Sequence, residues 1–215
     1  MASTDATDLV GTLGKLGFTQ GGIVETILVT VNWDGSFNAA PMGVRLVGQR
    51  IELRPYRTST TYANLRRGGA AAINTTYDPL LFLATAFKDE VEDQPHVEPD
   101  MRLRGADSTI MVEVQREEAT QCERSLFIAT PVKITVGKAY HFVLSRGRAQ
   151  AVEAVIHATR VKAFSEQGRT EEAAALIRRI EECAATVRRV SPPGSPECEA
   201  VDKLDEMMRS WRVQA

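Results

Sequence analysis

Four hydroxyl residues in succession, Thr58 to Thr61, follow two arginines and form the stretch of this sequence best suited to binding chemistry. Ser and Thr are favoured N-cap residues, so we expect a helix to begin near Ser59 or Thr60. A helix N-terminus carries free N–H groups and a partial positive charge, and both favour a phosphate. Arg54 and Arg57 stand just ahead and add charge-assisted donors. The stretch therefore predicts a phosphate cradle; the alternative is a capped helix with solvated arginines.

The segment before this stretch, Ala39 to Val44, is a strand of small residues interrupted by Pro41 and Gly43. Pro cannot donate a hydrogen bond to a central ladder, and Gly within a strand often marks close approach of a ligand to the backbone. Small side chains followed by a phosphate-type turn suit a flat ring that lies against the strand. The alternative is an edge strand with a bulge.

Several short strands position this stretch. Strands are predicted at 23–31, 37–47, 49–54, 70–75, 109–117 and 126–136. Asp34-Gly35 predicts the hairpin turn between the first two, because Asp-Gly tolerates positive φ. The apolar run 80–87 fits either a strand or a helix. Six strands are enough to close a small barrel.

The pattern changes to a helical period from Ser145 onwards. A second helix is predicted to start at Thr170, and a third after Ser195, with Pro196 at its first position. We therefore expect an N-terminal tail over 1–20, with one helical turn at 8–16, a barrel domain over 21–143 and a helical subdomain over 144–215.

The order ETILVTVNWDGSFNAAPMGV, then RPYRTSTTYANL, then AAINTTYD resembles the FMN-binding split-barrel flavoproteins. More narrowly, it resembles an uncharacterised family of that superfamily, a domain of unknown function found in methanogenic archaea and in bacteria that use one-carbon compounds. The resemblance covers about residues 21 to 86 and resumes in SRGRAQAVEAVIHATR, over 144–160. It implies a mostly β fold with α, in which an FMN-binding split β-barrel is followed by a C-terminal helical subdomain.

The resemblance also implies which residues hold the cofactor. Arg54, Thr58, Ser59 and Thr60 would bind the FMN phosphate, and the isoalloxazine would lie on the backbone of Ala40, Pro41, Met42 and Gly43. Asn64 and Asn74 are candidate polar contacts, with helix-face solvation and turn capping as the alternatives. Tyr56 either stacks on the ligand or packs within the protein.

Three functions are compatible with these expectations. The first is a flavoenzyme, an oxidoreductase that moves hydride between a reduced cofactor and a small-molecule acceptor through bound FMN. The second is a non-catalytic module that binds or stores FMN or docks a partner, because fold alone does not fix function. A third is a split barrel that has lost its ligand or has adapted to another cofactor such as haem. The resemblance further implies a homodimer with the flavin between subunits.

A polar stripe runs along the first C-terminal helix and includes Glu153, His157 and Arg160. Such a stripe usually marks a solvated face, and Glu153 with His157 is also a standard helical pair. Because the family resemblance falls on this helix, we also consider these three residues as substrate contacts on a face that closes over the flavin, across a dimer interface.

Composition and charge narrow the remaining classes. A net charge of -2 argues against a nucleic-acid binder, and no apolar run approaches the ~20 residues that span a bilayer. The N-terminus lacks the pattern of a signal peptide, and three widely spaced cysteines without a CxxC pair argue against structural zinc. We therefore expect a cytoplasmic protein without a metal. The acidic segment 88–100 is read as a solvated loop; the alternatives are a lid, or a metal site at His96 and Glu98.

Overall fold

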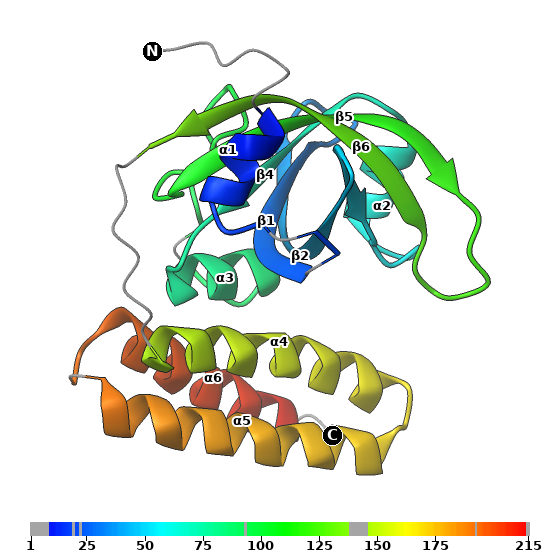
Figure 1. Ribbon diagram of the computed structural model, residues 1–215. Helices are drawn as coiled ribbons and strands as arrows, with labels where there is room; N and C mark the ends of the chain where they lie inside the picture. The colour runs from blue at the N-terminus through cyan, green and yellow to red at the C-terminus, as the bar shows by residue number, and fades with distance from the viewer. Residues whose placement is uncertain are drawn as a thin grey trace. The chain divides into compact units, whose positions relative to one another are not determined.

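The computed structural model describes residues 9–18, 20–21, 23–92, 94–137, 146–191 and 193–213. The chain divides into a barrel unit, Met1–Thr76 with Pro95–Ala139, and a helical unit, Tyr77–Gln94 with Tyr140–Ala215 (Figure 1). This division differs from the predicted boundaries of 21–143 and 144–215, because the segment 77–94 belongs with the C-terminal helices. Each unit is described by itself below.

The strands of the barrel unit form one closed antiparallel barrel in the order β1-β2-β3-β6-β5-β4. The described elements of this unit are α1 (Leu9–Lys15), β1 (Ile23–Val31), β2 (Phe37–Val47), β3 (Arg50–Leu53), α2 (Thr60–Arg66), β4 (Ala70–Thr75), β5 (Ser108–Glu118) and β6 (Leu126–Val136). Each of the predicted strands is therefore confirmed, with bounds shifted by a residue or so.

The turn between β1 and β2 forms as Asp34-Gly35 predicts. Gly35 adopts φ 83°, which an L side chain would resist. The Asp34 carboxylate accepts hydrogen bonds from the backbone N–H and hydroxyl of Ser36, at 3.0 and 2.6 Å. These bonds lower the pKa of Asp34. The turn fixes the register in which Val31 faces Phe37 and Ile27 faces Pro41.

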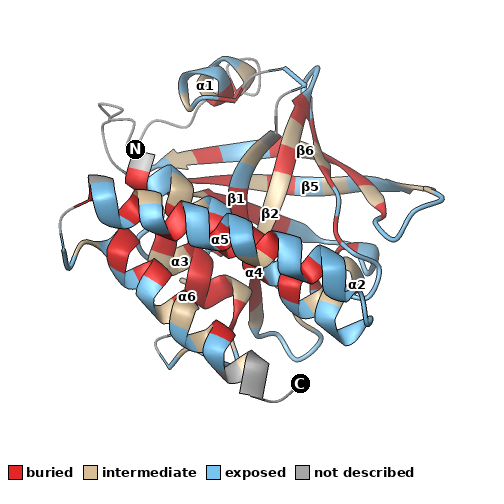
Figure 2. Ribbon diagram, turned by 90° about the horizontal axis from the view of Figure 1, so that it is seen from below, coloured by how far each residue is buried: buried red, intermediate tan, exposed pale blue. Residues whose placement is uncertain are grey.

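Buried residues alternate with more exposed ones along the strands (Figure 2), and the buried ones form the barrel core together with one face of α1. Leu28, Ile51, Ile73 and Phe127 are nearly or fully buried there. Leu9 and Leu13 of α1 belong to the same cluster, which also includes Val44, Leu46, Leu53, Ile110, Val112 and Ala129. The segment predicted as a tail therefore contributes to the core of the barrel unit.

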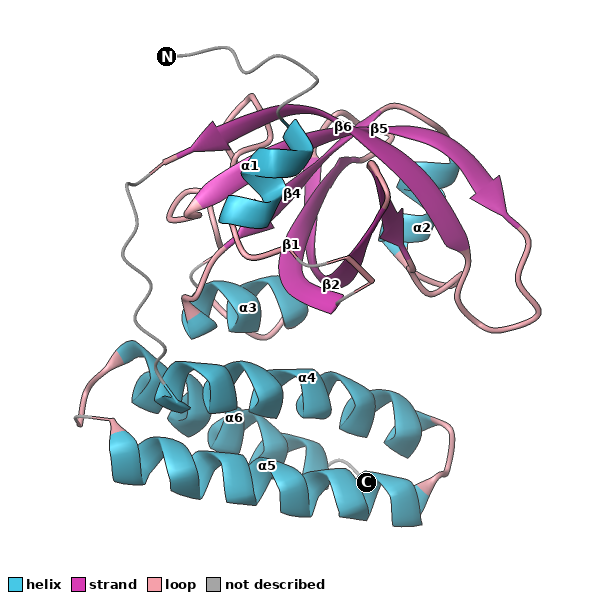
Figure 3. Cartoon of the chain, viewed as in Figure 1, coloured by secondary structure: helices cyan, strands magenta, loops and turns pink. Residues whose placement is uncertain are grey.

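The helical unit contains α3 (Pro79–Ala86), α4 (Arg146–Glu166), α5 (Thr170–Val190) and α6 (Pro196–Val213) (Figure 3). α4 and α5 pack as an antiparallel pair joined by a tight turn at Gly168, whose φ is 71°. The small residues Ala151, Ala154 and Ala158 of α4 are fully buried, which allows the helices to approach closely.

The run 80–87, which the sequence left open, is a helix. Asp78 caps it by accepting a hydrogen bond from Leu80 N at 2.9 Å, and Pro79 occupies a first-turn position that favours Pro. Leu83 and Phe87 bury their side chains in the core of the helical unit, and the Phe87 ring lies 5.5 Å from that of Trp211. This packing explains why 77–94 belongs to the helical unit.

Candidate functional site

The N-terminus of α2 is built as the hydroxyl run predicts. Ser59 is the N-cap, with extended backbone angles, and its Oγ accepts a hydrogen bond from Tyr62 N at 3.1 Å. The same hydroxyl donates to Tyr56 O at 2.7 Å, which ties the helix start to the chain before it. The prediction of a helix starting near Ser59 or Thr60 is confirmed.

Donors without a partner gather at this helix end. Among the described residues, the backbone N–H groups of Thr60 and Thr61 have no acceptor, as expected for the first turn of a helix. Thr58 and Thr60 are exposed, and their hydroxyls make no hydrogen bond within the described part of the chain. Thr61 is buried, so a ligand oxygen at this surface would find the Thr60 N–H and two hydroxyl donors.

The arginines near this end differ in how firmly they are held. Arg54 forms an ion pair with Glu52 at 3.0 Å. Arg57 donates to Thr120 O at 3.1 Å and to Cys122 O at 3.4 Å. Because these acceptors carry no formal charge, the Arg57 cation is not neutralised by them.

Tyr56 packs within the protein on one face. The Arg124 guanidinium lies 4.1 Å from the centre of its ring and donates to its hydroxyl oxygen at 2.7 Å. The Tyr56 side chain is 42% exposed, so the remainder of the ring faces outward. Nothing local in the sequence marks Arg124 as its partner, because the two residues lie far apart in the chain.

β2 has an open edge over the predicted ring-binding segment. β3 pairs only with Val44–Val47, so the described part of β2 before Val44 is paired on one side, with β1. Pro41 suits this position because it has no N–H to leave unpaired. Ala40, Pro41, Met42 and Gly43 are each partly exposed. The structure thus brings small residues, an open backbone edge and the α2 N-terminus together in one unit.

A buried polar network holds α2 against β1 and β2. The Asn38 side-chain amide donates to Thr61 Oγ1 at 3.1 Å and to Thr30 Oγ1 at 3.3 Å. The Asn64 amide donates to Thr30 Oγ1 at 3.0 Å and to Asn32 Oδ1 at 2.8 Å. Asn64, predicted as a cofactor contact, therefore spends both of its N–H donors within the protein. Asn38 was not predicted as a site residue from the sequence, although a polar residue within an apolar strand can indicate a buried polar contact.

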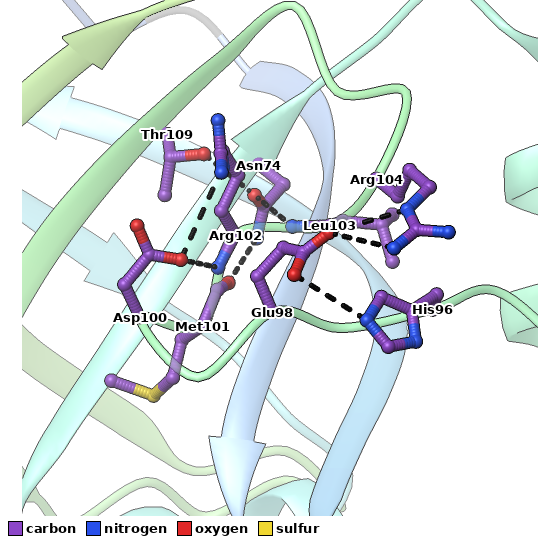
Figure 4. A network of polar contacts seen from close by, with 9 residues as sticks. All are labelled: Asn74, His96, Glu98, Asp100, Met101, Arg102, Leu103, Arg104 and Thr109. Carbon is purple, nitrogen blue, oxygen red and sulfur yellow. Dashed lines mark hydrogen bonds and ion pairs between the residues drawn. The ribbon is translucent and has the colours of Figure 1, made fainter.

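Asn74, the other predicted polar contact, is fully buried and fully used (Figure 4). Its Oδ1 accepts from Leu103 N at 3.0 Å and from Thr109 Oγ1 at 2.8 Å. Its Nδ2 donates to Ala72 O and Met101 O, both at 3.3 Å. These four bonds exhaust the capacity of a side-chain amide. In this structure the Asn74 side chain has nothing left to offer a cofactor.

The segment that Asn74 holds is a small hairpin around residues 97–103. Met101 sits at its bulge with φ 60°, a left-handed conformation normally taken by Gly, and its side chain is buried. Glu98 pairs with Arg104 at 3.1 Å and with His96 at 3.4 Å (Figure 4). The acidic segment is thus ordered by ion pairs over this part. No cluster of three or more metal-ligating side chains occurs among the described residues.

A small cavity of the barrel unit lies away from the predicted cradle. It has a volume of about 60 Å³ at the far end of α2 and is lined by Thr30, Asn64 and Arg67. It is far too small for a flavin, since small-molecule sites are typically ≈ 300–1,000 Å³. The cradle residues instead lie on an exposed surface of the barrel unit.

The three helical candidates lie in the helical unit. Glu153 Oε1 is 3.3 Å from His157 Nε2, so the predicted helical pair forms. Glu153 and Arg160 are exposed, but His157 is buried rather than on a solvated face. Burial lowers the pKa of His157; Glu153 opposes this, and Arg179 and Arg160 add to it.

A known protein family matches the barrel unit of this chain. A family model described as the N-terminal domain of a protein of unknown function (DUF447) matches residues 24–138, more than half of the chain. The chain belongs to this family. The match spans all the barrel strands except the first residue of β1. The family expected from the sequence is thereby confirmed.

Solved structures similar to this DUF447 member include a flavin-bound one. The FMN-bound DUF447 protein MM1853 from Methanosarcina mazei is 26% identical, with a TM-score of 0.71, and the match covers 90% of this chain and 98% of that chain. The predicted fold class, a split β-barrel followed by C-terminal helices, is confirmed.

None of the described helices is long and apolar enough to cross a membrane.

Two flavin reductases match more distantly. The styrene monooxygenase flavin reductase from Pseudomonas putida S12 is 15% identical, with a TM-score of 0.46, over 54% of this chain and 81% of that chain. Flavin reductase HpaC complexed with NADP+ is 12% identical, with a TM-score of 0.47, over 62% of this chain and 90% of that chain. Neither is similar enough to support an assignment of function.

Proposed function

We propose that this chain binds FMN in its barrel unit and acts as an oxidoreductase on a small molecule. The observation that carries the proposal is the FMN-bound member of the same family, which is 26% identical over 90% of this chain. Bound FMN would supply hydride transfer, so the protein has to bind it, orient it and control access to it.

The donor set at the α2 N-terminus fits the FMN phosphate. The free N–H group of Thr60 and the exposed hydroxyls of Thr58 and Thr60 are neutral donors to phosphate oxygens. The Arg57 cation, whose hydrogen bonds within the described residues all go to neutral oxygens, supplies positive charge beside them. Charge-assisted bonds of this kind contribute about 1.5–3 kcal/mol each.

The open edge of β2 fits the flavin ring. Ala40, Pro41 and Gly43 are small or flat, and the whole segment from Ala40 to Gly43 is partly exposed and unpaired on one side, so a planar ring can approach its backbone. The Asn38–Thr61 hydrogen bond of 3.1 Å fixes the helix start beside the start of this segment. Asn38 is therefore a positioning residue, because it links the proposed phosphate site at the α2 N-terminus to the proposed ring site on β2.

Two of the predicted contacts are assigned differently. Asn74 holds the 97–103 hairpin with all four of its hydrogen bonds, and Asn64 holds α2 with both of its donors. We propose that both stabilise the barrel unit and that neither donates to FMN. Arg54 remains a proposed phosphate ligand, which requires it to exchange its ion pair with Glu52.

The first test is the visible absorption spectrum of the purified protein, recorded after loading with FMN and desalting. Retained flavin bands support the proposal, and a colourless protein contradicts it. Thr58→Val combined with Thr60→Val should reduce retention, whereas Arg50→Gln, on the exposed start of β3, should not.

The catalytic part of the proposal has its own test. Rapid bleaching of bound FMN by NADH or NADPH, with turnover on an acceptor, supports an oxidoreductase. A bound flavin that is inert to every donor supports the alternative, a non-catalytic FMN-binding module.

Two further expectations stay predictions. One is a homodimer, which gel filtration with light scattering measures directly. The other is that Glu153, His157 and Arg160 contact the substrate. Alanine variants of His157 and Arg160 that leave turnover unchanged would remove that second expectation.

A further inference from the structure

The helical unit contains a cavity of about 260 Å³ between the end of α3 and the second half of α4. The two helices pack against each other within this unit (Figure 3). Residues 86–90 form one wall, and the other wall is the face of α4 that carries Thr159, Lys162, Ala163 and Glu166. The volume lies just below the ≈ 300–1,000 Å³ of typical small-molecule sites, so the cavity has room for a small guest molecule.

Two lysines line this cavity, and their surroundings differ. Lys162 Nζ lies 2.6 Å from Glu90 Oε1, and the Trp211 indole N–H donates to the other oxygen of Glu90 at 2.8 Å. Lys88 lies in the turn after α3, and its side chain is half-buried. Burial lowers the pKa of the Lys88 ammonium, and the nearby Asp89 carboxylate only partly opposes this. The Lys88 nitrogen is therefore in its free-base form more often than the nitrogen of an ordinary surface lysine.

The remainder of the lining combines small apolar groups with an excess of carboxylates. Ala86 and Ala163 contribute small apolar side chains from the two walls. Three acidic residues line the cavity against its two lysines. Glu90 is paired with Lys162, whereas the Glu166 carboxylate makes no ion pair or hydrogen bond within the described residues. A guest that carries its own negative charge is therefore disfavoured, and a neutral guest with a short apolar body fits.

We infer that Lys88 captures small neutral aldehydes in this cavity as an imine. The Lys88 nitrogen attacks the carbonyl carbon, the π pair of the C=O bond moves to oxygen, and a proton passes from nitrogen to oxygen to give a carbinolamine. Loss of one water then forms the C=N bond, so nothing is oxidised or reduced. Only the free-base amine is a nucleophile, and desolvation of a lysine in a cavity is a way to provide it.

Lys162 provides a contrast within the same cavity. Its nitrogen is 2.6 Å from Glu90 Oε1, so attack on an aldehyde would require this ion pair to be given up. The same Glu90 carboxylate is fixed on its other oxygen by Trp211. The inference therefore distinguishes two lysines that meet the same guest, and it assigns the imine to Lys88 alone.

The test is reductive trapping of the imine in the intact chain. Propionaldehyde is the probe, and sodium cyanoborohydride reduces its imine to a stable secondary amine, which peptide mass spectrometry quantifies at each lysine. Lys133, exposed on β6 of the barrel unit, is the internal reference. At neutral pH we expect Lys88 to be alkylated several-fold faster than Lys133. Burial without access to the cavity would have the opposite effect, because a shielded amine reacts more slowly than an exposed one.

A charged probe and two variants locate the effect. With glyoxylate, an anionic aldehyde, the preference for Lys88 should decrease, because carboxylates are in excess around the cavity. Ala163→Leu fills the cavity from α4 and should bring the Lys88 rate down to that of Lys133 or below. Ala174→Leu, at an exposed position of α5, should leave the preference unchanged.

Three results would overturn the inference. The first is a Lys88 rate no higher than that of Lys133 in the unmodified chain, a comparison that needs no variant to fold. The second is a preference for Lys88 that survives Ala163→Leu. The third is trapping at Lys162 equal to that at Lys88. All of these readouts are taken without FMN, so they do not depend on the proposed flavin site.

Discussion

Asn74 provides the most quantitative prediction. Asn74→Ala removes an amide that makes four buried hydrogen bonds, to Ala72, Met101, Leu103 and Thr109. Each lost bond costs about 1 kcal/mol, and a buried donor left without an acceptor costs about 1–3 kcal/mol. The Leu103 N–H is such a donor, because Leu103 is fully buried. The four bonds together contribute about 4 kcal/mol and the unsatisfied Leu103 N–H adds about 1–3 kcal/mol, so we expect the variant to lose about 5–7 kcal/mol of stability.

A loss of this size is a large part of the ≈ 5–15 kcal/mol that stabilises a typical domain. Urea unfolding of the purified chain measures the total loss. Hydrogen exchange followed by mass spectrometry locates the loss, and we expect peptides covering 95–107 to show the largest increase in exchange rate over the unmodified chain. Gln115→Ala is the matched control, since Gln115 is an exposed amide on β5 with one long hydrogen bond of 3.4 Å; it should change stability by less than about 0.5 kcal/mol.

Two results would refute the reasoning about Asn74. One is a stability loss below about 1 kcal/mol, which would mean that the four bonds contribute little. The other is a variant that stays stable but loses FMN affinity, which would make Asn74 a cofactor contact as first expected from the sequence.

Three further predictions follow from the contacts. Gly147→Ala should destabilise the helical unit by about 1–2 kcal/mol in urea unfolding, because the added Cβ would lie 2.0 Å from Ser191 Oγ. Combining it with Ser191→Ala should restore the lost stability, because the nearest atom of residue 191 would then be its Cβ, 3.4 Å away. Burial is the main cause that lowers the pKa of His157 in the folded state from its ordinary 6.5, so the unfolded state takes up the proton first as the pH falls below 6.5. The free energy of unfolding should therefore decrease from pH 8 to pH 5 in urea denaturation, and His157→Gln should make this decrease smaller. Iodoacetamide should modify Cys122 before Cys183 in mass spectra, because Cys122 is exposed with a thiol pKa lowered by the Thr120 hydroxyl, whereas burial raises that of Cys183.

The local parts of the fold were predictable because their causes are local. The Ser59 cap and the Asp34-Gly35 turn depend on residues within three or four positions, so the sequence pattern identifies both. The helix 79–86 could also have been recognised, since Asp78 followed by Pro79 is a helix-start signal. The run 80–87 is apolar nearly throughout, so its pattern did not distinguish a helix from a strand.

The roles of the asparagines were not predictable in this way. Asn74 is held by residues 27 to 35 positions further along the chain, and Asn64 by residues 32 and 34 positions earlier. A buried amide that completes a network and an exposed amide that meets a ligand look the same in sequence. Likewise, nothing near Leu83 or Phe87 indicates that their packing partners lie in helices formed much later in the chain.

The measurement that tests the central claim most directly is the affinity of the purified chain for FMN compared with riboflavin, followed by flavin fluorescence. The two ligands differ only in the phosphate that the Thr58–Thr61 cradle is proposed to hold. The account predicts that FMN binds at least about tenfold more tightly, since one charge-assisted hydrogen bond is enough for that ratio. Equal affinities would contradict the cradle, and no binding of either flavin would contradict the proposed function itself.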